Sequence, residues 1–227
     1  MAVNIVECID DSVKIQNVIV SVSDKKGLDK MIKGLVEVNP DIKIYSTGGT
    51  FSAIKAMNIK QLKQNLIQIS DYTGQPEMQG GLVKTLDFKI YLGLLSETYN
   101  EAHKADLQRT GAVPMDMVIV NLYPFRETIA RLDATIEMAR ANIDIGGPCM
   151  IRASAKNFLR VAVVTNPADY DWVLDELKKT GGKLSLQTRF ELAKKAFALT
   201  AEYDTAIAKY LNGVNFTEAS KCYRKMN

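Results

Sequence analysis

Two polar segments have the composition of anion-binding loops. Residues 21–25 (SVSDK) combine the hydroxyl of Ser23 with the charge of Lys25 where a helix is predicted to begin, and backbone N–H groups at a helix start attract anions. Residues 46–50 (STGGT) follow the next apolar run, and their two glycines permit close backbone approach. Each segment alone also fits an ordinary helix cap or tight turn. Together, at one edge of a sheet, they predict a phosphate site.

Three further segments carry groups suited to proton transfer or charge stabilisation. Lys84 follows a pair of glycines, and Tyr123 precedes a proline that favours extended backbone. Asp144 precedes two glycines and a proline at the predicted start of a helix that also carries Lys156. The alternatives are a solvated loop lysine, an aromatic lid on the core, and an acid that complements the helix dipole.

The single histidine, His103, restricts the chemistry. Metal sites built from histidine need two or three of them, and a serine triad would have to use this one. His103 lies in a polar stretch that predicts an exposed helix and a solvated side chain. Acid–base catalysis is therefore expected to use Lys, Asp, Glu, Tyr or ordered water, and no metal site is predicted.

Composition excludes several classes of protein. The 227 residues are 47% apolar and 24% charged with a net charge of +3, which is typical of a folded globular chain. No basic run suggests a nucleic-acid partner, and no apolar run is long enough to cross a membrane. The three cysteines lack a C-x-x-C pair, which favours a reduced, cytoplasmic location without disulfides.

The elements that must position these groups alternate between strands and helices. Strands are predicted at residues 17–22, 42–45, 66–69, 90–95, 115–122 and 160–165. Helices are predicted at 28–35, 51–57, 97–110, 135–142 and 147–157, in a segment opening at Asn166, and from Ser185 to about Leu211; residues 70–88 read as irregular. The order predicts an α/β sandwich with a mainly parallel sheet, whose ligand site lies at the carboxyl ends of its strands.

The predicted organisation has three parts. Residues 1–15 form an N-terminal extension, residues 16–180 the α/β domain, and residues 181–227 a C-terminal helical segment with its tail. Residues 1–14 and 213–227 are expected to be loosely attached.

Seven motifs occur in the order and spacing of one known family. They are residues 21–25, 46–50, 76–78 (PEM), 83–86 (VKTL), 121–125 (NLYPF), 142–147 (NIDIGG) and 155–157 (AKN). Over roughly residues 16–211 the sequence resembles the inosine monophosphate (IMP) cyclohydrolase domain of bifunctional purine-biosynthesis proteins. The resemblance implies a methylglyoxal-synthase-like fold and the closure of 5-formamidoimidazole-4-carboxamide ribotide to IMP, with loss of water and no cofactor.

The resemblance also implies which residues form the site. Those matching the family's active-site positions are Lys84, Tyr123, Asp144 and Lys156. Those expected to bind the substrate are Ser23, Asp24, Lys25, Ser46, Thr47, Gly48, Gly49, Thr85, Asn121 and Ile145.

The reaction gives these groups provisional roles. The carboxamide nitrogen is a poor nucleophile and must lose a proton as it attacks the formyl carbon, and the resulting carbinolamine must then lose hydroxide. Lys156 is expected to transfer the proton with Asp144 orienting it or the carboxamide. Lys84 and Tyr123 are expected to stabilise developing negative charge.

One segment departs from the family. Leu82 replaces an arginine that is expected to contact the substrate, a loss worth about 1.5–3 kcal/mol, and Arg126 is a candidate to compensate. Asp87 and Phe88 replace a His-Pro pair, and Tyr91 and Leu92 replace a histidine and a small residue.

These departures keep a second function open, a nucleotide-binding regulatory module with weak or no turnover. Phosphate elimination of the methylglyoxal-synthase type is a third, disfavoured by the motifs. The expected ligand is a purine nucleotide. A homodimer is expected from the family alone, and a formyltransferase on a separate chain is expected because this chain ends at Asn227.

Overall fold

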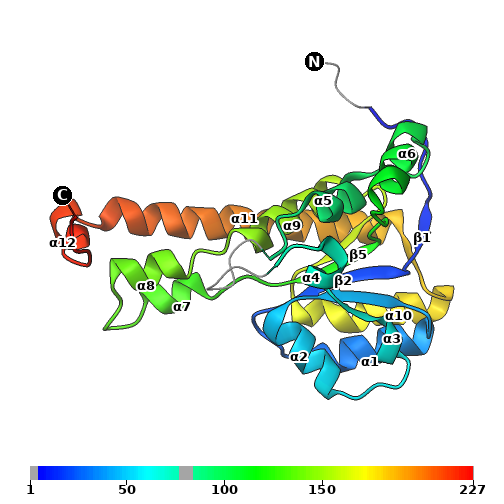
Figure 1. The fold of residues 1–227 in the computed structure, drawn as a ribbon, viewed down its shortest axis with the longest axis horizontal. Helices are drawn as coiled ribbons and strands as arrows, with labels where there is room; N and C mark the ends of the chain where they lie inside the picture. The colour runs from blue at the N-terminus through cyan, green and yellow to red at the C-terminus, as the bar shows by residue number, and fades with distance from the viewer. Residues whose placement is uncertain (1–4, 77–83, 227) are drawn as a thin grey trace.

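The computed structural model describes residues 5–76 and 84–226, which form a three-layer α/β sandwich (Figure 1). Within these residues the central sheet has five parallel strands in the order β4-β3-β2-β5-β6. They are β2 (Asn17–Ser21), β3 (Lys43–Ser46), β4 (Leu66–Gln68), β5 (Met117–Val120) and β6 (Ala162–Val164). The predicted fold class and its mainly parallel sheet are confirmed.

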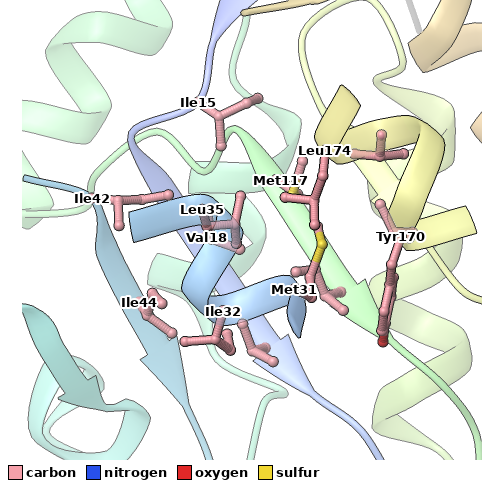
Figure 2. Close-up of a cluster of buried hydrophobic side chains, with 14 of the residues drawn as sticks. Ile15, Val18, Met31, Ile32, Leu35, Ile42, Ile44, Met117, Tyr170 and Leu174 are labelled. Atoms are coloured by element: carbon pink, nitrogen blue, oxygen red, sulfur yellow. The ribbon is translucent and has the colours of Figure 1, made fainter. Parts of the chain in front are cut away.

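Alternate strand residues face opposite helical layers, as the period of a strand requires. Val18 and Val20 face the layer formed by α1 (Leu28–Val38), α2 (Gly48–Ala56), α3 (Leu62–Asn65) and α10 (Tyr170–Thr180). Figure 2 shows α1 and α10 side chains packed in this core with those of the strands. Ile19 faces the other layer, formed by α4 (Ile69–Thr73), α5 (Phe88–Leu95), α9 (Gly146–Lys156) and the first part of α11 (Leu186–Gly213).

The remaining helices extend one layer or the other. α6 (Glu101–Thr110) packs on α5, and the short η2 (Pro167–Asp169) leads into α10. α11 continues past the sheet, and α7 (Phe125–Ile129) and α8 (Ile136–Ala141) lie beside its extension, followed by α12 (Phe216–Ser220) (Figure 1). Phe125, Ala139 and Tyr203 form the buried core of this extension.

The N-terminal stretch is held more firmly than expected. β1 (Ser12–Lys14) pairs antiparallel with β7 (Lys183–Ser185), next to Arg189, which is fully buried. The guanidinium donates to the carbonyl oxygens of Asp10, Asp11, Phe158, Leu159 and Leu184. The expectation of loose attachment is therefore wrong for residues 10–14.

The strand predicted at residues 90–95 is a helix instead, α5. The carboxylate of Asp87 caps it by accepting the N–H of Lys89 at 2.8 Å, and Ile90, Gly93 and Leu94 face the core at helical spacing. Gly93 packs so closely that a Cβ atom would lie 2.4 Å from the oxygen of Val113. A short apolar run does not by itself distinguish a strand from a helix. Residues 69–73 likewise form α4 in a stretch predicted to be irregular.

Three of the predicted helical segments begin at a side chain that caps the first turn. Thr135, Asn166 and Ser185 each accept a backbone N–H in the first turn that follows them, from Met138, Ala168 and Thr188 respectively. The boundaries of the three predicted parts at residues 15 and 180 stay predictions.

Candidate active site

A cavity of about 400 Å³ opens at the carboxyl ends of β2 and β5, where Ser21 and Val120 contribute to its wall. The carboxyl edge of a parallel sheet is where ligands bind in folds of this class. The first turns of α2 and α9 also line it, together with residues 84–86, 141 and 143–145.

One wall is the amino end of α2. Thr47 is the residue before the helix, and Gly48 and Gly49 follow it into the cavity wall. The hydroxyl of Thr50 accepts the N–H of Val22 at 3.1 Å and donates to the carbonyl of the same residue at 3.0 Å. These bonds fix the partly positive end of the helix beside the end of β2.

The loop after β2 leads to α1 at the predicted residue, but its N–H groups have a different role from the predicted one. α1 begins only at Leu28, so the loop N–H groups are not at its first turn. Instead, the N–H groups of Ser23 and Asp24 donate to the side-chain oxygen of Asn121 at 2.6 and 3.0 Å, and its side-chain nitrogen donates to the carbonyl of Asp24 at 2.8 Å. Asn121 thus holds the loop, which contributes the side chains of Ser23 and Lys25 to the cavity.

Two predicted substrate-binding residues do not line the cavity. Ser46 is fully buried within β3, and its hydroxyl donates to the carbonyl of Val20 at 2.7 Å, which joins β3 to β2. The carboxylate of Asp24 accepts the N–H of Lys26 at 2.9 Å in a local turn. Both side chains serve the backbone around the site.

Lys84 and Thr85 lie against the first residues of α2 and α9, respectively. The ammonium of Lys84 lies against Gly48, where a Cβ atom would be 2.8 Å from Nζ. The hydroxyl of Thr85, which is buried, would lie 2.6 Å from a Cβ atom at Gly146. The structure therefore places an ammonium group beside the amino end of α2, where both line the cavity.

Asp144 also lines the cavity, in the segment between α8 and α9. Its carboxylate accepts the N–H of Gly147 at 2.8 Å and that of Tyr123 at 3.4 Å. Burial raises the pKa of Asp144, and these two hydrogen bonds oppose the rise. Tyr123 is half exposed and lines the cavity beside Ile145, so its ring is not a lid on the core.

Sequence reasoning missed three residues that shape the site, namely Ser21, Thr50 and Tyr203. Ser21 Oγ lies 3.3 Å from the hydroxyl of Thr47, and Thr50 has the contacts given above. Thr50 belongs to the STGGT motif, which pointed to the site, whereas Tyr203 belongs to no motif. It lies some sixty residues from Asp144 on α11 and contributes only a hydroxyl to the Asp144 segment.

Two predicted residues lie away from the cavity. Lys156 is exposed in the last turn of α9, whereas the cavity is at the first turn, and ten residues of helix span about 15 Å. Arg126 donates to the carbonyl of Glu202 at 3.3 Å and lines a separate groove beside α11, so it does not supply a guanidinium to the cavity.

The altered segment is described only in part. Leu82, Val83 and the second and third residues of the 76–78 motif lie outside the described residues. Asp87, Phe88, Tyr91 and Leu92 build α5, with Asp87 as its cap and Phe88 largely exposed at its first position.

His103 lies away from the cavity and is less exposed than predicted. His103 is half buried rather than solvated, because its Nδ1 accepts the N–H of Glu97 at 3.2 Å at the start of α6. Residues 5–76 and 84–226 contain no cluster of side chains that could hold a metal ion. They also contain no helix that is long and apolar enough to cross a membrane.

Comparison with known proteins identifies the family. The model of the MGS-like (methylglyoxal-synthase-like) domain matches residues 27–149, which is more than half of the chain. The chain belongs to the MGS-like domain family. Residues 154–227 of this MGS-like domain protein match a second model, the AICARFT/IMPCHase bienzyme.

Curated relatives of this MGS-like protein are longer than the chain. Each is a "Bifunctional purine biosynthesis protein PurH": that of Ruminiclostridium cellulolyticum is 47% identical over 197 residues, that of Thermoanaerobacter sp. 45% over 203, and one from Bacillus thuringiensis 48% over 193. The matches cover 85–88% of this chain and 36–38% of the relatives, so the chain spans little more than a third of their length. The resemblance to this family is confirmed.

A solved structure extends the likeness to the fold. The crystal structure of ForH superposes with a TM-score of 0.73 at 29% identity, covering 88% of this chain and all of that one. The predicted methylglyoxal-synthase-like fold of the MGS-like protein is confirmed.

Proposed function

We propose that the chain is an IMP cyclohydrolase that closes 5-formamidoimidazole-4-carboxamide ribotide to IMP and water. The observation that carries the proposal is the arrangement of one cavity. Lys84, the amino end of α2 and the partly buried carboxylate of Asp144 all line it. This pairing suits a ligand with a phosphate at one end and a reacting amide at the other.

The phosphate would bind between the loop after β2 and the first turn of α2. Ser23, Lys25 and Thr47 supply side-chain donors there, and the helix end supplies a favourable field. The hydrogen bonds that Asn121 makes to the loop hold it open in this form before the ligand arrives.

The reacting groups would lie beside Asp144. As the carboxamide nitrogen attacks the formyl carbon, the carboxylate of Asp144 takes a proton from that nitrogen, and the ammonium of Lys84 gives a proton to the formyl oxygen, which becomes the hydroxyl of a carbinolamine. This hydroxyl then leaves as water with the proton held by Asp144, while the former formamido nitrogen gives its proton to the amine of Lys84, so both side chains return to their starting states. The ammonium of Lys84 and the hydroxyl of Tyr123 stabilise the oxygen as its charge develops.

This assignment moves the proton-transfer role away from Lys156. The side chain lies at the far end of α9 from Asp144, and proton transfer needs hydrogen-bond contact or one bridging water. Lys84 and Asp144, which do line the cavity, are the better pair.

The test is direct assay of ring closure by ultraviolet absorbance. The expected result is turnover by the wild-type protein, loss of turnover in Lys84→Met and Asp144→Asn, and retention in Lys60→Met, which removes an exposed lysine outside the cavity. Absence of turnover together with calorimetric binding of IMP would overturn the enzyme and support a nucleotide-binding module.

The setting of the activity is also a proposal. The match of residues 154–227 to the AICARFT/IMPCHase bienzyme model supports a formyltransferase as the source of the substrate, and the resemblance supports a homodimer. Cys8 and Cys222 are free, exposed thiols, which suit a reducing compartment, so we propose a cytoplasmic location.

A further inference from the structure

The hydroxyl of Tyr203 bridges two backbone groups in the segment that carries Asp144. It accepts the N–H of Asp144 at 2.8 Å and donates to the carbonyl of Asn142 at 3.2 Å. Tyr203 belongs to α11, so these bonds join a long, regular helix to the irregular stretch between α8 and α9. One hydroxyl thereby satisfies a backbone donor and a backbone acceptor two residues apart, and it restricts the movement of the backbone on both sides of Ile143.

The ring of Tyr203 is itself held in place. It is 8% exposed and packs edge to face with Phe125 at 6.1 Å between ring centroids, and Phe125 packs on Tyr210 at 5.9 Å. Phe125 begins α7 two residues after Tyr123. The same aromatic group therefore supports both Tyr123 and Asp144, the residues that are joined by a hydrogen bond across the cavity wall.

The carboxylate of Asp144 depends on this support. Its hydrogen bonds to Gly147 and Tyr123 fix the side chain relative to its neighbours, whereas Tyr203 fixes the backbone from which the side chain extends. Burial raises the pKa of Tyr203, so the hydroxyl stays protonated near neutral pH and keeps its donor.

We propose that Tyr203 is a positioning residue for ring closure, which sets the carboxylate of Asp144 against the reacting amide. The assignment rests on the proposed function. Tyr203 is too deeply placed in the aromatic core to touch the substrate and acts through Asp144.

The test is Tyr203→Phe, which keeps the ring and removes both hydrogen bonds, with Tyr210→Phe as the matched control. Tyr210 lies in the same cluster and on the same helix. For Tyr203→Phe we expect kcat to fall about tenfold with KM within about twofold, because the phosphate wall on α2 is untouched. We also expect amide hydrogen exchange at Asp144 to quicken about tenfold, and Tyr210→Phe to match the wild type in both.

A second readout separates positioning from stability. Loosening the segment lets water reach Asp144, so the acid limb of the kcat–pH profile should move to lower pH in Tyr203→Phe. Wild-type kcat and an unshifted profile, despite faster exchange at Asp144, would overturn the assignment, as would a fall in kcat that merely follows the unfolded fraction. Absence of turnover in the wild type would instead overturn the proposed function, and the catalytic role of Tyr203 with it.

Discussion

Adding a methyl group at Gly48 tests two features at once, the positive-φ backbone conformation of this residue and the position of the Lys84 ammonium. Its φ is +44°, a conformation that costs an L-residue about 1–2 kcal/mol, and a Cβ atom would lie 2.8 Å from Nζ of Lys84. Comfortable contacts are about 3.5–4.0 Å, so in Gly48→Ala the ammonium must move by about 1 Å. A misplacement of that size costs about a hundredfold in rate when the group is catalytic.

Two measurements follow from this geometry. In thermal unfolding, Gly48→Ala should lower Tm by about 2–8 °C, from the backbone strain alone. In the ring-closure assay, kcat should fall by about 10- to 100-fold. Gly111→Ala is the matched control, because Gly111 has a φ of +65°, no atom within 4 Å of a Cβ position, and a place outside the cavity. It should lose comparable stability and keep wild-type kcat.

Either of two results would refute the reasoning about Gly48. Equal losses of kcat in Gly48→Ala and Gly111→Ala would show that activity follows stability and not the position of Lys84. Full activity in Gly48→Ala with the expected loss of Tm would remove Lys84 from the chemistry.

Three further predictions concern other residues of the site. Asn121→Ala leaves three backbone groups without their partner, so it should destabilise the protein by about 1–3 kcal/mol in denaturant unfolding and raise KM more than it lowers kcat; a pure kcat loss would contradict the loop assignment. Asp144 acts as a base only when ionised, and burial raises its pKa, so the acid limb of kcat should lie above pH 3.8. Asp144→Asn should abolish that limb and lower kcat by at least about a hundredfold, and an unchanged pH profile would argue against this base. Lys156→Ala should keep turnover within about twofold, and its loss would return the proton-transfer role to Lys156.

The sequence predicted the residues of the site most accurately where they follow a buried strand. Thr47, Asn121 and Tyr123 come directly after buried parallel strands, and the carboxyl ends of such strands meet at one edge, so the structure brings their side chains to one cavity. Ser46 shows the limit of this reasoning. It is the last residue of β3, and the alternation of strand side chains turns its hydroxyl inward to β2.

Two residues on helices, Lys156 and Tyr203, could not be placed relative to the cavity from the sequence. The resemblance grouped Lys156 with Asp144, but Asp144 precedes the first turn of α9 and Lys156 lies in its last turn, so the length of the helix separates them. Tyr203 could not be recognised because its apolar spacing on α11 marks only a core residue. Its hydroxyl matters through a contact fifty-nine residues away in sequence.

The hydrogen bonds of Arg189 make the attachment of the N-terminal strand β1 depend on a helix that is synthesised much later. Arg189 draws together carbonyl groups from segments that include Asp10 and Asp11, which lie 179 and 178 residues before it. At about 5–20 residues per second of synthesis, the first strand waits roughly 10–40 s for the arginine that secures it. Contacts so distant in sequence also close slowly. The strand β1 is therefore secured only after the residues of all five parallel strands of the described sheet have been synthesised.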